Sequence, residues 1–246
     1  ASGWPSRLLV ASVAAAAAAM ASKENAVVLP FLVLAYDWFF VEPPRGESWA
    51  RGLWRRRGYF AGLAATWCLI AAQLAMQAGK YQEFKEGAFT PLEYARTQPG
   101  VILHYLRLAV WPVGQQIDYS AWPVARSAPQ VLPPLLVILA ALFATAAGTL
   151  GRRPWAFLGV FFFLVLAPTS SVMPVEALAN EHRMYLALAA VVTGIVCGIV
   201  ALADGIAARR PGSSPADPRW PLAVAAGVIL ALVLTTQFRN QLYSKV

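Results

Sequence analysis

The sequence has few of the residues that build common metal and nucleotide sites. Its 246 residues include two cysteines, two histidines and no glycine-rich loop of the Walker or Rossmann pattern. Cys68 and Cys197 each lie inside an apolar run, so neither a disulfide framework nor a thiolate metal site is expected. The two histidines lie far apart, without a cysteine or carboxylate at metal-ligand spacing. Metal sites, cofactors and nucleotide binding are therefore not indicated.

Charged residues are also scarce, at 13% of the chain, whereas hydrophobic residues make up 59% and the mean hydropathy is +0.55. This composition is too apolar for one soluble core and is typical of a polytopic membrane protein. A net charge of +8 would suggest a nucleic-acid partner for a soluble domain. Here the arginines fall in short loops between apolar runs, where they set membrane topology, so no nucleic-acid partner is expected.

Seven apolar runs approach the roughly 20 residues that a helix needs to cross the hydrocarbon core. The run from Gly100 to Trp111 lies between two prolines and reaches only about 18 Å as a helix, so we expect it to be re-entrant or interfacial. The predicted fold is an all-α polytopic helical membrane protein with one transmembrane domain over 1–246 and no internal repeat. The predicted spans are about 7–21, 26–41, 58–78, 131–150, 154–172, 183–203 and 220–237.

Arginine clusters predict the orientation of these spans. The loops at 45–57, 151–153 and 209–219 are each arginine-rich, and such loops favour the cytoplasmic side. All three share that side only if 100–111 does not cross. The N-terminus is then cytoplasmic and the C-terminus extracytoplasmic. The outward connections are 22–25, 79–130 and 168–183.

The long outer connection, about 79–130, has its own local signals. Thr90, Pro91 and Glu93 form a capping-box pattern, which predicts a short helix that begins there and ends before Pro99. Aromatic residues through this region indicate a segment that lies on the membrane surface. They are Tyr81, Phe84, Phe89 and Tyr94.

Polar clusters gather on the predicted outer side. Inside the spans charged residues are nearly absent, which argues against an ion-coupled transporter with a relay at the midplane. Each cluster also has a plainer interpretation, as interfacial anchors, snorkelling side chains or one-sided polarity of a surface helix. The clusters are Lys23 with Glu24, His104 with Arg107, Gln115 to Tyr119, and Glu181 to Arg183.

Arg183 carries the most specific chemical prediction. It precedes a long apolar run, where the N-terminal end of a helix favours an anion, and guanidinium suits bidentate contact with phosphate. The alternative is an ion pair with Glu176 or Glu181. We expect its side chain at the water-facing edge of the helix, where substitution would change the fold little. We also expect Lys23, Asp118 and Arg183 to line one outer cavity.

Four motifs occur in order through nearly the whole chain. They are "SKENAVVLPFLVLAYDWFF", "YLRLAVWPVGQQIDYS", "EHRMYLALA" and "FRNQLY". In this order they resemble the membrane module of the transmembrane and tetratricopeptide-repeat O-mannosyltransferase family, including its bacterial relatives. The resemblance implies a GT-C glycosyltransferase fold. It also implies transfer of a mannose-like sugar from a polyprenyl-phosphate donor on the extracytoplasmic side.

The resemblance also implies roles for the motif residues. Arg183, helped by His182 and Lys23, would bind the donor phosphate, and Asp118 and Glu24 are the in-chain candidates for a catalytic carboxylate. The remaining motif residues, expected to bind substrate, are Tyr119, Glu181 and Tyr185.

The chain departs from the family pattern at three points. The acidic catalytic loop of the family is expected upstream of Ala1, no tetratricopeptide repeat occurs within the 246 residues, and Ala187 stands where a proline is expected. The alternative function is therefore a noncatalytic subunit of a larger membrane complex. The expected location is a membrane, the bacterial inner membrane, with membrane lipid and partner membrane subunits as neighbours.

Overall fold

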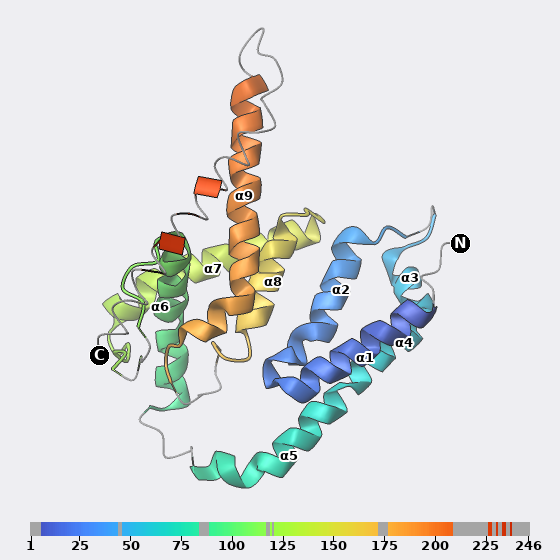
Figure 1. The fold of residues 1–246 in the computed structure, drawn as a ribbon, viewed down its shortest axis with the longest axis horizontal. Coiled ribbons are helices and arrows are strands. Elements are labelled where there is room, and N and C mark those ends of the chain that lie inside the picture. The colour runs from blue at the N-terminus through green and yellow to red at the C-terminus, as the bar shows by residue number, and fades with distance from the viewer. Residues whose placement is uncertain are drawn as a thin grey trace. The chain divides into compact units, whose positions relative to one another are not determined.

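The computed structural model describes residues 6–43, 46–83, 89–116, 119, 121–171 and 177–208, with 226, 227, 230, 233, 234 and 237. Over these residues the chain forms α-helices and 3-10 helices without a strand, so the prediction of an all-α fold is confirmed (Figure 1). The chain divides into two compact units, Ala1–Thr193 and Gly194–Val246. A single transmembrane domain over 1–246 stays a prediction. The site described below lies within the first unit.

The first half of this unit is a cluster of helices around α1. Helix α1 packs against α4 and α5, and a short 3-10 helix, η1, turns the chain from α1 into α2 (Figure 1). Their bounds are α1 Ser6–Ser22, η1 Glu24–Val28, α2 Leu29–Phe40, α3 Trp49–Arg55, α4 Arg57–Ala65 and α5 Trp67–Glu83.

The second half is built on α7, which packs against both α6 and α8. Helix α8 also contacts α2 and η1, and this contact joins the two halves. The bounds are α6 Pro91–Val110, α7 Ala128–Leu150, α8 Ala156–Leu166, the 3-10 helix η3 Glu181–Arg183, and α9 Met184–Ala208, whose first ten residues belong to this unit.

One buried ion pair fixes the arginine-rich connection after α2. The Asp37 carboxylate accepts hydrogen bonds from Arg56 Nη2 at 2.8 Å and from Trp49 Nε1 at 3.0 Å. Asp37 is buried, so the two donors supply the polar contacts that water would otherwise make. The predicted cytoplasmic arginines therefore include one with a structural role.

Helix α6 begins as predicted but does not end as predicted. Thr90 Oγ1 accepts from Glu93 N at 3.2 Å, and Glu93 Oε2 accepts from Thr90 N at 2.9 Å, so the capping box is confirmed. The expected end before Pro99 is wrong, because α6 is one helix of 20 residues that runs on to Val110. The proline removes one backbone donor. Pro99 is itself buried, so packing around it offsets that loss.

Helix α6 buries one face in the core of the unit, and the expectation that this region lies on the membrane surface stays a prediction. Tyr94 and Val101 have no exposed surface, and Tyr105 has 1%. Packing of these side chains against the rest of the unit removes a large apolar area from solvent. Phe84 lies outside the described residues. A re-entrant position for 100–111 stays a prediction.

Three of the described helical segments are long enough and apolar enough to cross a membrane: Arg57–Met76, Ala128–Leu150 and Glu181–Gly205. They coincide with three of the seven predicted runs. The first and fifth runs correspond to the shorter apolar helices α1 and α8, and the second is divided between η1 and α2. Most of 220–237 lies outside the described residues.

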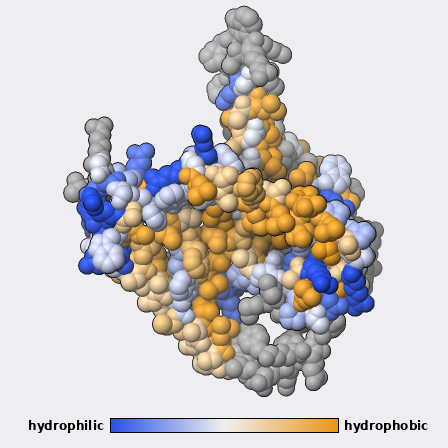
Figure 2. Space-filling model, turned by 180° about the vertical axis from the view of Figure 1, so that it is seen from behind, coloured by the Kyte–Doolittle hydropathy of each residue, from blue (hydrophilic) through white to orange (hydrophobic). Residues whose placement is uncertain are grey.

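The surface of the described helices is unusually apolar. Figure 2 shows hydrophobic residues gathered over a broad area, with hydrophilic residues at its edges. On α7, Leu150 is 83% exposed and Phe143 is 76% exposed. Large exposed apolar areas of this kind are compatible with a lipid environment.

Close packing of α7 on α8 depends on two glycines. A Cβ at Gly159 would lie 2.9 Å from Thr145 Cγ2, and a Cβ at Gly148 would lie 2.7 Å from Ala156 Cβ. Small residues let helices approach closely in membrane proteins. We expect Gly159→Ala to destabilise the fold by about 1–3 kcal/mol through overpacking, measured as a lower Tm in detergent.

The matched control is Gly100→Ala in α6, where a Cβ meets open space. Alanine is the better helix former by roughly 0.5–1 kcal/mol, so this variant should melt at the same or a higher temperature. Equal losses of Tm in both variants would contradict the packing argument.

Candidate functional site

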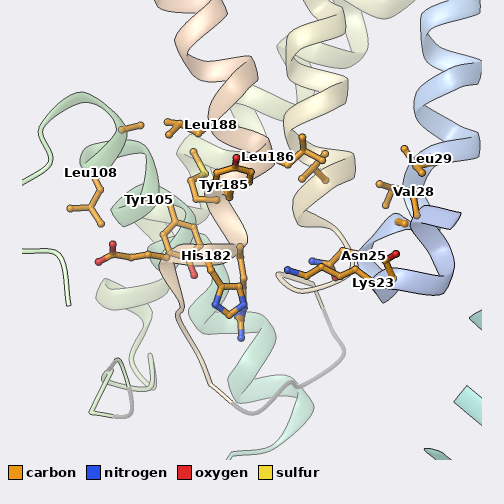
Figure 3. Close-up of a pocket in the computed structure, with 18 of the residues that line it drawn as sticks. Lys23, Asn25, Val28, Leu29, Tyr105, Leu108, His182, Tyr185, Leu186 and Leu188 are labelled. Atoms are coloured by element: carbon orange, nitrogen blue, oxygen red, sulfur yellow. The ribbon is translucent and has the colours of Figure 1, made fainter. Parts of the chain in front are cut away.

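A cavity of about 790 Å³ opens in the first unit, between the α1–η1 turn, α6, α8 and the start of α9 (Figure 3). Most of its wall is apolar and includes Val28, Leu29, Leu108, Val165 and Leu188. Its polar lining residues are Ser22, Lys23, Asn25, Gln115, Glu181, His182 and Arg183. The cavity therefore combines an apolar wall with groups of both charge signs.

The turn between α1 and η1 supplies Lys23 to this cavity. Lys23 has extended backbone angles (φ −155°, ψ 131°), which break the helix, while its carbonyl accepts from Ala26 N at 3.0 Å. The side chains of Lys23 and Asn25 extend across the cavity towards His182 (Figure 3). Glu24 is exposed and is not among the lining residues, so its proposed catalytic role has no support from this geometry.

Arg183 lines the cavity, but its side chain is not at a water-facing edge, and that expectation is wrong. The residue is 7% exposed. Its Nη1 donates to Tyr94 Oη at 3.2 Å and to the carbonyls of Thr169 and Leu178 at 3.3 Å each. Its Nη2 donates to the Ala177 carbonyl at 2.7 Å. The guanidinium is thus held mainly by backbone oxygens.

These contacts change the chemical role of Arg183. Nη1 is engaged by three acceptors and Nη2 by one, so a ligand could take Nη1 only if these hydrogen bonds were broken. The alternative ion pair with Glu181 does not form, and Glu176 lies outside the described residues. A guanidinium keeps its charge at any physiological pH. Arg183 therefore places a fixed positive charge in the wall behind the cavity.

Helix α6 positions the loop that leads to Arg183. Gln98 Nε2 donates to the Leu178 carbonyl at 3.1 Å. Tyr105 Oη donates to the Asn180 carbonyl at 2.8 Å and accepts from Asn180 N at 2.6 Å. The Asn180 side chain in turn caps η3 at His182 N. Sequence reasoning missed Tyr105, although Gln98 and Tyr105, seven residues apart, fall on one face of a helix.

Glu181 is held by a second set of contacts. Its Oε1 accepts from Tyr119 Oη at 2.6 Å and from Gln116 N at 2.8 Å. His104 Nε2 lies 3.1 Å from the same Tyr119 hydroxyl. Burial, and then the neighbouring Glu181 carboxylate, raise the pKa of Tyr119, so it stays a neutral donor. Burial lowers the pKa of His104, which favours the neutral ring.

The structure therefore brings together most of the predicted site residues. Lys23 and Arg183 line one cavity, as predicted, together with Glu181, His182 and Tyr185, which is 85% exposed. Tyr119 is linked to the group through Glu181. The prediction for Asp118 concerns a residue outside the described part of the chain.

Chemically, this arrangement suits a ligand with an anionic head and an apolar body. Comparisons with protein family models, curated proteins and solved structures found no match to the chain. The resemblance to the O-mannosyltransferase family accordingly stays a prediction made from four sequence motifs.

Proposed function

We propose that the chain is the donor-binding part of an integral membrane glycosyltransferase of the GT-C type. Its donor would be a polyprenyl-phosphate-linked, mannose-like sugar, bound on the extracytoplasmic side. The observation that carries this proposal is the pairing of an apolar wall with Lys23, His182 and the buried Arg183 charge in one cavity of about 790 Å³.

A lipid phosphate matches both parts of the cavity. Isoprenoid carbons gain free energy by packing on apolar side chains, and the phosphate gains from nearby cations. Lys23 is the flexible cation that faces the open space, so it is the direct phosphate contact in this proposal. Arg183 contributes mainly its positive charge, because both of its terminal nitrogens already donate to carbonyls.

The same cations would assist chemistry. When the sugar leaves the donor, negative charge develops on the lipid phosphate, and preorganised positive groups stabilise that charge in the transition state. Arg183 is well suited to this task because its contacts hold it in place before the ligand binds. Lys23 and His182 complete the positive side of the cavity.

The alternative, a noncatalytic scaffold subunit, expected these polar clusters to form ion pairs with partner chains. Arg183 and Glu181 instead find hydrogen-bond partners within the first unit. The buried Arg183 charge therefore needs no partner chain, and one oxygen of Glu181 is satisfied within the chain. This observation favours a ligand site over an interface.

Binding of polyprenyl phosphate tests the proposal. We expect the purified protein in detergent to bind a polyprenyl phosphate at least 10-fold more tightly than the polyprenol of the same length. That ratio equals about 1.4 kcal/mol, the scale of one charge-assisted contact. Thermal shift and ligand fluorescence quenching would measure it. Equal affinity for alcohol and phosphate would remove the case for a phosphate site.

The seven-span topology is part of the same proposal. It places 79–130 outside and 209–219 inside, so cysteines introduced at Ser120 and Ser213 should be labelled from opposite sides of the membrane. Membrane-impermeant maleimide applied to intact cells, and then to permeabilised cells, measures this directly. Labelling of both from one side would overturn the arrangement.

A further inference from the structure

Glu181 is the only carboxylate among the described residues that line the cavity. Glu24 is exposed outside that lining, and Asp37 is paired with Arg56 in the connection after α2. A glycosyl transfer to a hydroxyl needs a group to accept the hydroxyl proton, and carboxylates serve this role. Within the described chain, the cavity therefore offers one candidate.

The contacts of Glu181 fix its carboxylate asymmetrically. Both hydrogen bonds, from Tyr119 Oη and Gln116 N, reach Oε1. Oε2 has no hydrogen-bond partner among the residues that the structure describes. Tyr119, which donates to Glu181, is 5% exposed, and its hydroxyl contacts His104. Burial and this contact keep the Tyr119 hydroxyl in place. Oε1 is therefore held in place, and Oε2 remains able to accept a proton.

We propose that Glu181 is the general base of the transfer reaction, accepting the acceptor's proton on Oε2. This inference rests on the proposed glycosyltransferase function. The acceptor oxygen forms a bond to the anomeric carbon, and the bond from that carbon to the phosphate oxygen breaks. The lipid phosphate leaves with the electron pair, and the proton moves from the acceptor hydroxyl to Glu181. Tyr119 and His104 are positioning residues in this step.

The anchoring of Oε1 explains why these residues suit the task. A general base must lie within hydrogen-bond reach of the proton that it removes, and a fixed carboxylate keeps that geometry. Lys23 and His182 line the same cavity, so the leaving phosphate and the base face one space. Glu181 and the phosphate site therefore lie in the same cavity, in which donor and acceptor would react.

The variant Glu181→Gln separates basicity from structure. Its amide oxygen can still accept from Tyr119 and Gln116, but the group no longer accepts a proton. With polyprenyl-phosphate mannose and a serine-containing peptide, we expect kcat to fall by about 10²- to 10⁴-fold. Binding of polyprenyl phosphate should not weaken, because Glu181 makes no contact with the phosphate in this proposal and its replacement removes a negative charge from the same cavity.

Azide as the acceptor gives a second measurement, which depends on sugar transfer but not on a general base. Azide is an anion with no proton to lose, so its attack on the anomeric carbon forms a glycosyl azide without a base. We expect Glu181→Gln to make glycosyl azide at a rate close to that of the unaltered protein. The variant Arg126→Gln removes an exposed charge elsewhere and should alter neither reaction.

The outcomes separate this inference from the function on which it rests. If the unaltered protein neither transfers mannose nor binds polyprenyl phosphate, both fail. If it binds polyprenyl phosphate but does not transfer mannose, the role of Glu181 is overturned and the donor site stands. If it transfers mannose, and Glu181→Gln loses both reactions or neither, only the role of Glu181 is overturned. If the glutamine variant does not fold, Glu181→Asp replaces it. The shorter carboxylate should slow peptide transfer and leave azide transfer unchanged, and equal slowing of both would overturn the role.

Discussion

Arg183→Ala should destabilise the protein by about 1–3 kcal/mol, seen as a Tm roughly 5 °C lower in detergent. The guanidinium donates to three carbonyls and to Tyr94 Oη. Its removal takes the donor from the Ala177 carbonyl, whereas the Leu178 carbonyl keeps Gln98 Nε2 and the Thr169 carbonyl keeps Tyr94 Oη. Each unsatisfied buried acceptor costs about 1–3 kcal/mol before the structure relaxes.

Two further variants make this prediction specific. Arg183→Lys keeps the charge but places its three donors on one nitrogen, so we expect a smaller but clear loss of Tm. His182→Gln alters the exposed neighbour and should change Tm by less than about 2 °C. An unaltered Tm in Arg183→Ala would mean that the carbonyl contacts do not support the fold.

Lys23→Gln should weaken the binding of polyprenyl phosphate by roughly 10- to 100-fold. A charge-assisted contact is worth about 1.5–3 kcal/mol, and the apolar wall of the cavity limits screening by water. Lys23 is exposed to the cavity and makes no core contact, so Tm without ligand should stay within about 2 °C. Lys23→Arg should retain most of the affinity.

Arg126→Gln is the matched control, because it removes one positive charge from the same predicted side of the membrane. Arg126 pairs with Glu93 at 3.3 Å, and its side chain is 72% exposed. Exposed pairs contribute about 0–1 kcal/mol, so this variant should bind and fold normally. Equal weakening in both variants would show that overall charge, rather than a local contact of Lys23, attracts the ligand.

The sequence was most informative where local chemistry decides structure. Thr90 and Glu93 predicted the start of α6 because a capping box involves neighbours only. The meeting of Lys23 and Arg183 followed from topology, since arginine-rich loops placed both residues on one side. Each of these inferences needed no knowledge of how the helices pack.

The sequence was least informative where packing decides structure. Arg183 was expected in water because arginine is rarely buried without a carboxylate. Its partners are mainly backbone carbonyls, from the 177–183 loop and from Thr169. Every residue has a backbone carbonyl, so no sequence pattern predicts these contacts. Pro99 was likewise taken as a helix end, yet burial of α6 keeps the helix continuous.

The hydrogen bonds of α6 reach both of the long connections that are predicted to lie outside. Thr97 Oγ1 accepts from Ala125 N at 3.0 Å, and Gln98 and Tyr105 bind the backbone at Leu178 and Asn180. Each contact divides a long connection into shorter closed segments, which lowers the number of conformations available to it. Glu181 and His182, which line the cavity, directly follow the backbone that α6 anchors at Leu178 and Asn180, so ligand binding has less ordering to do at these two residues.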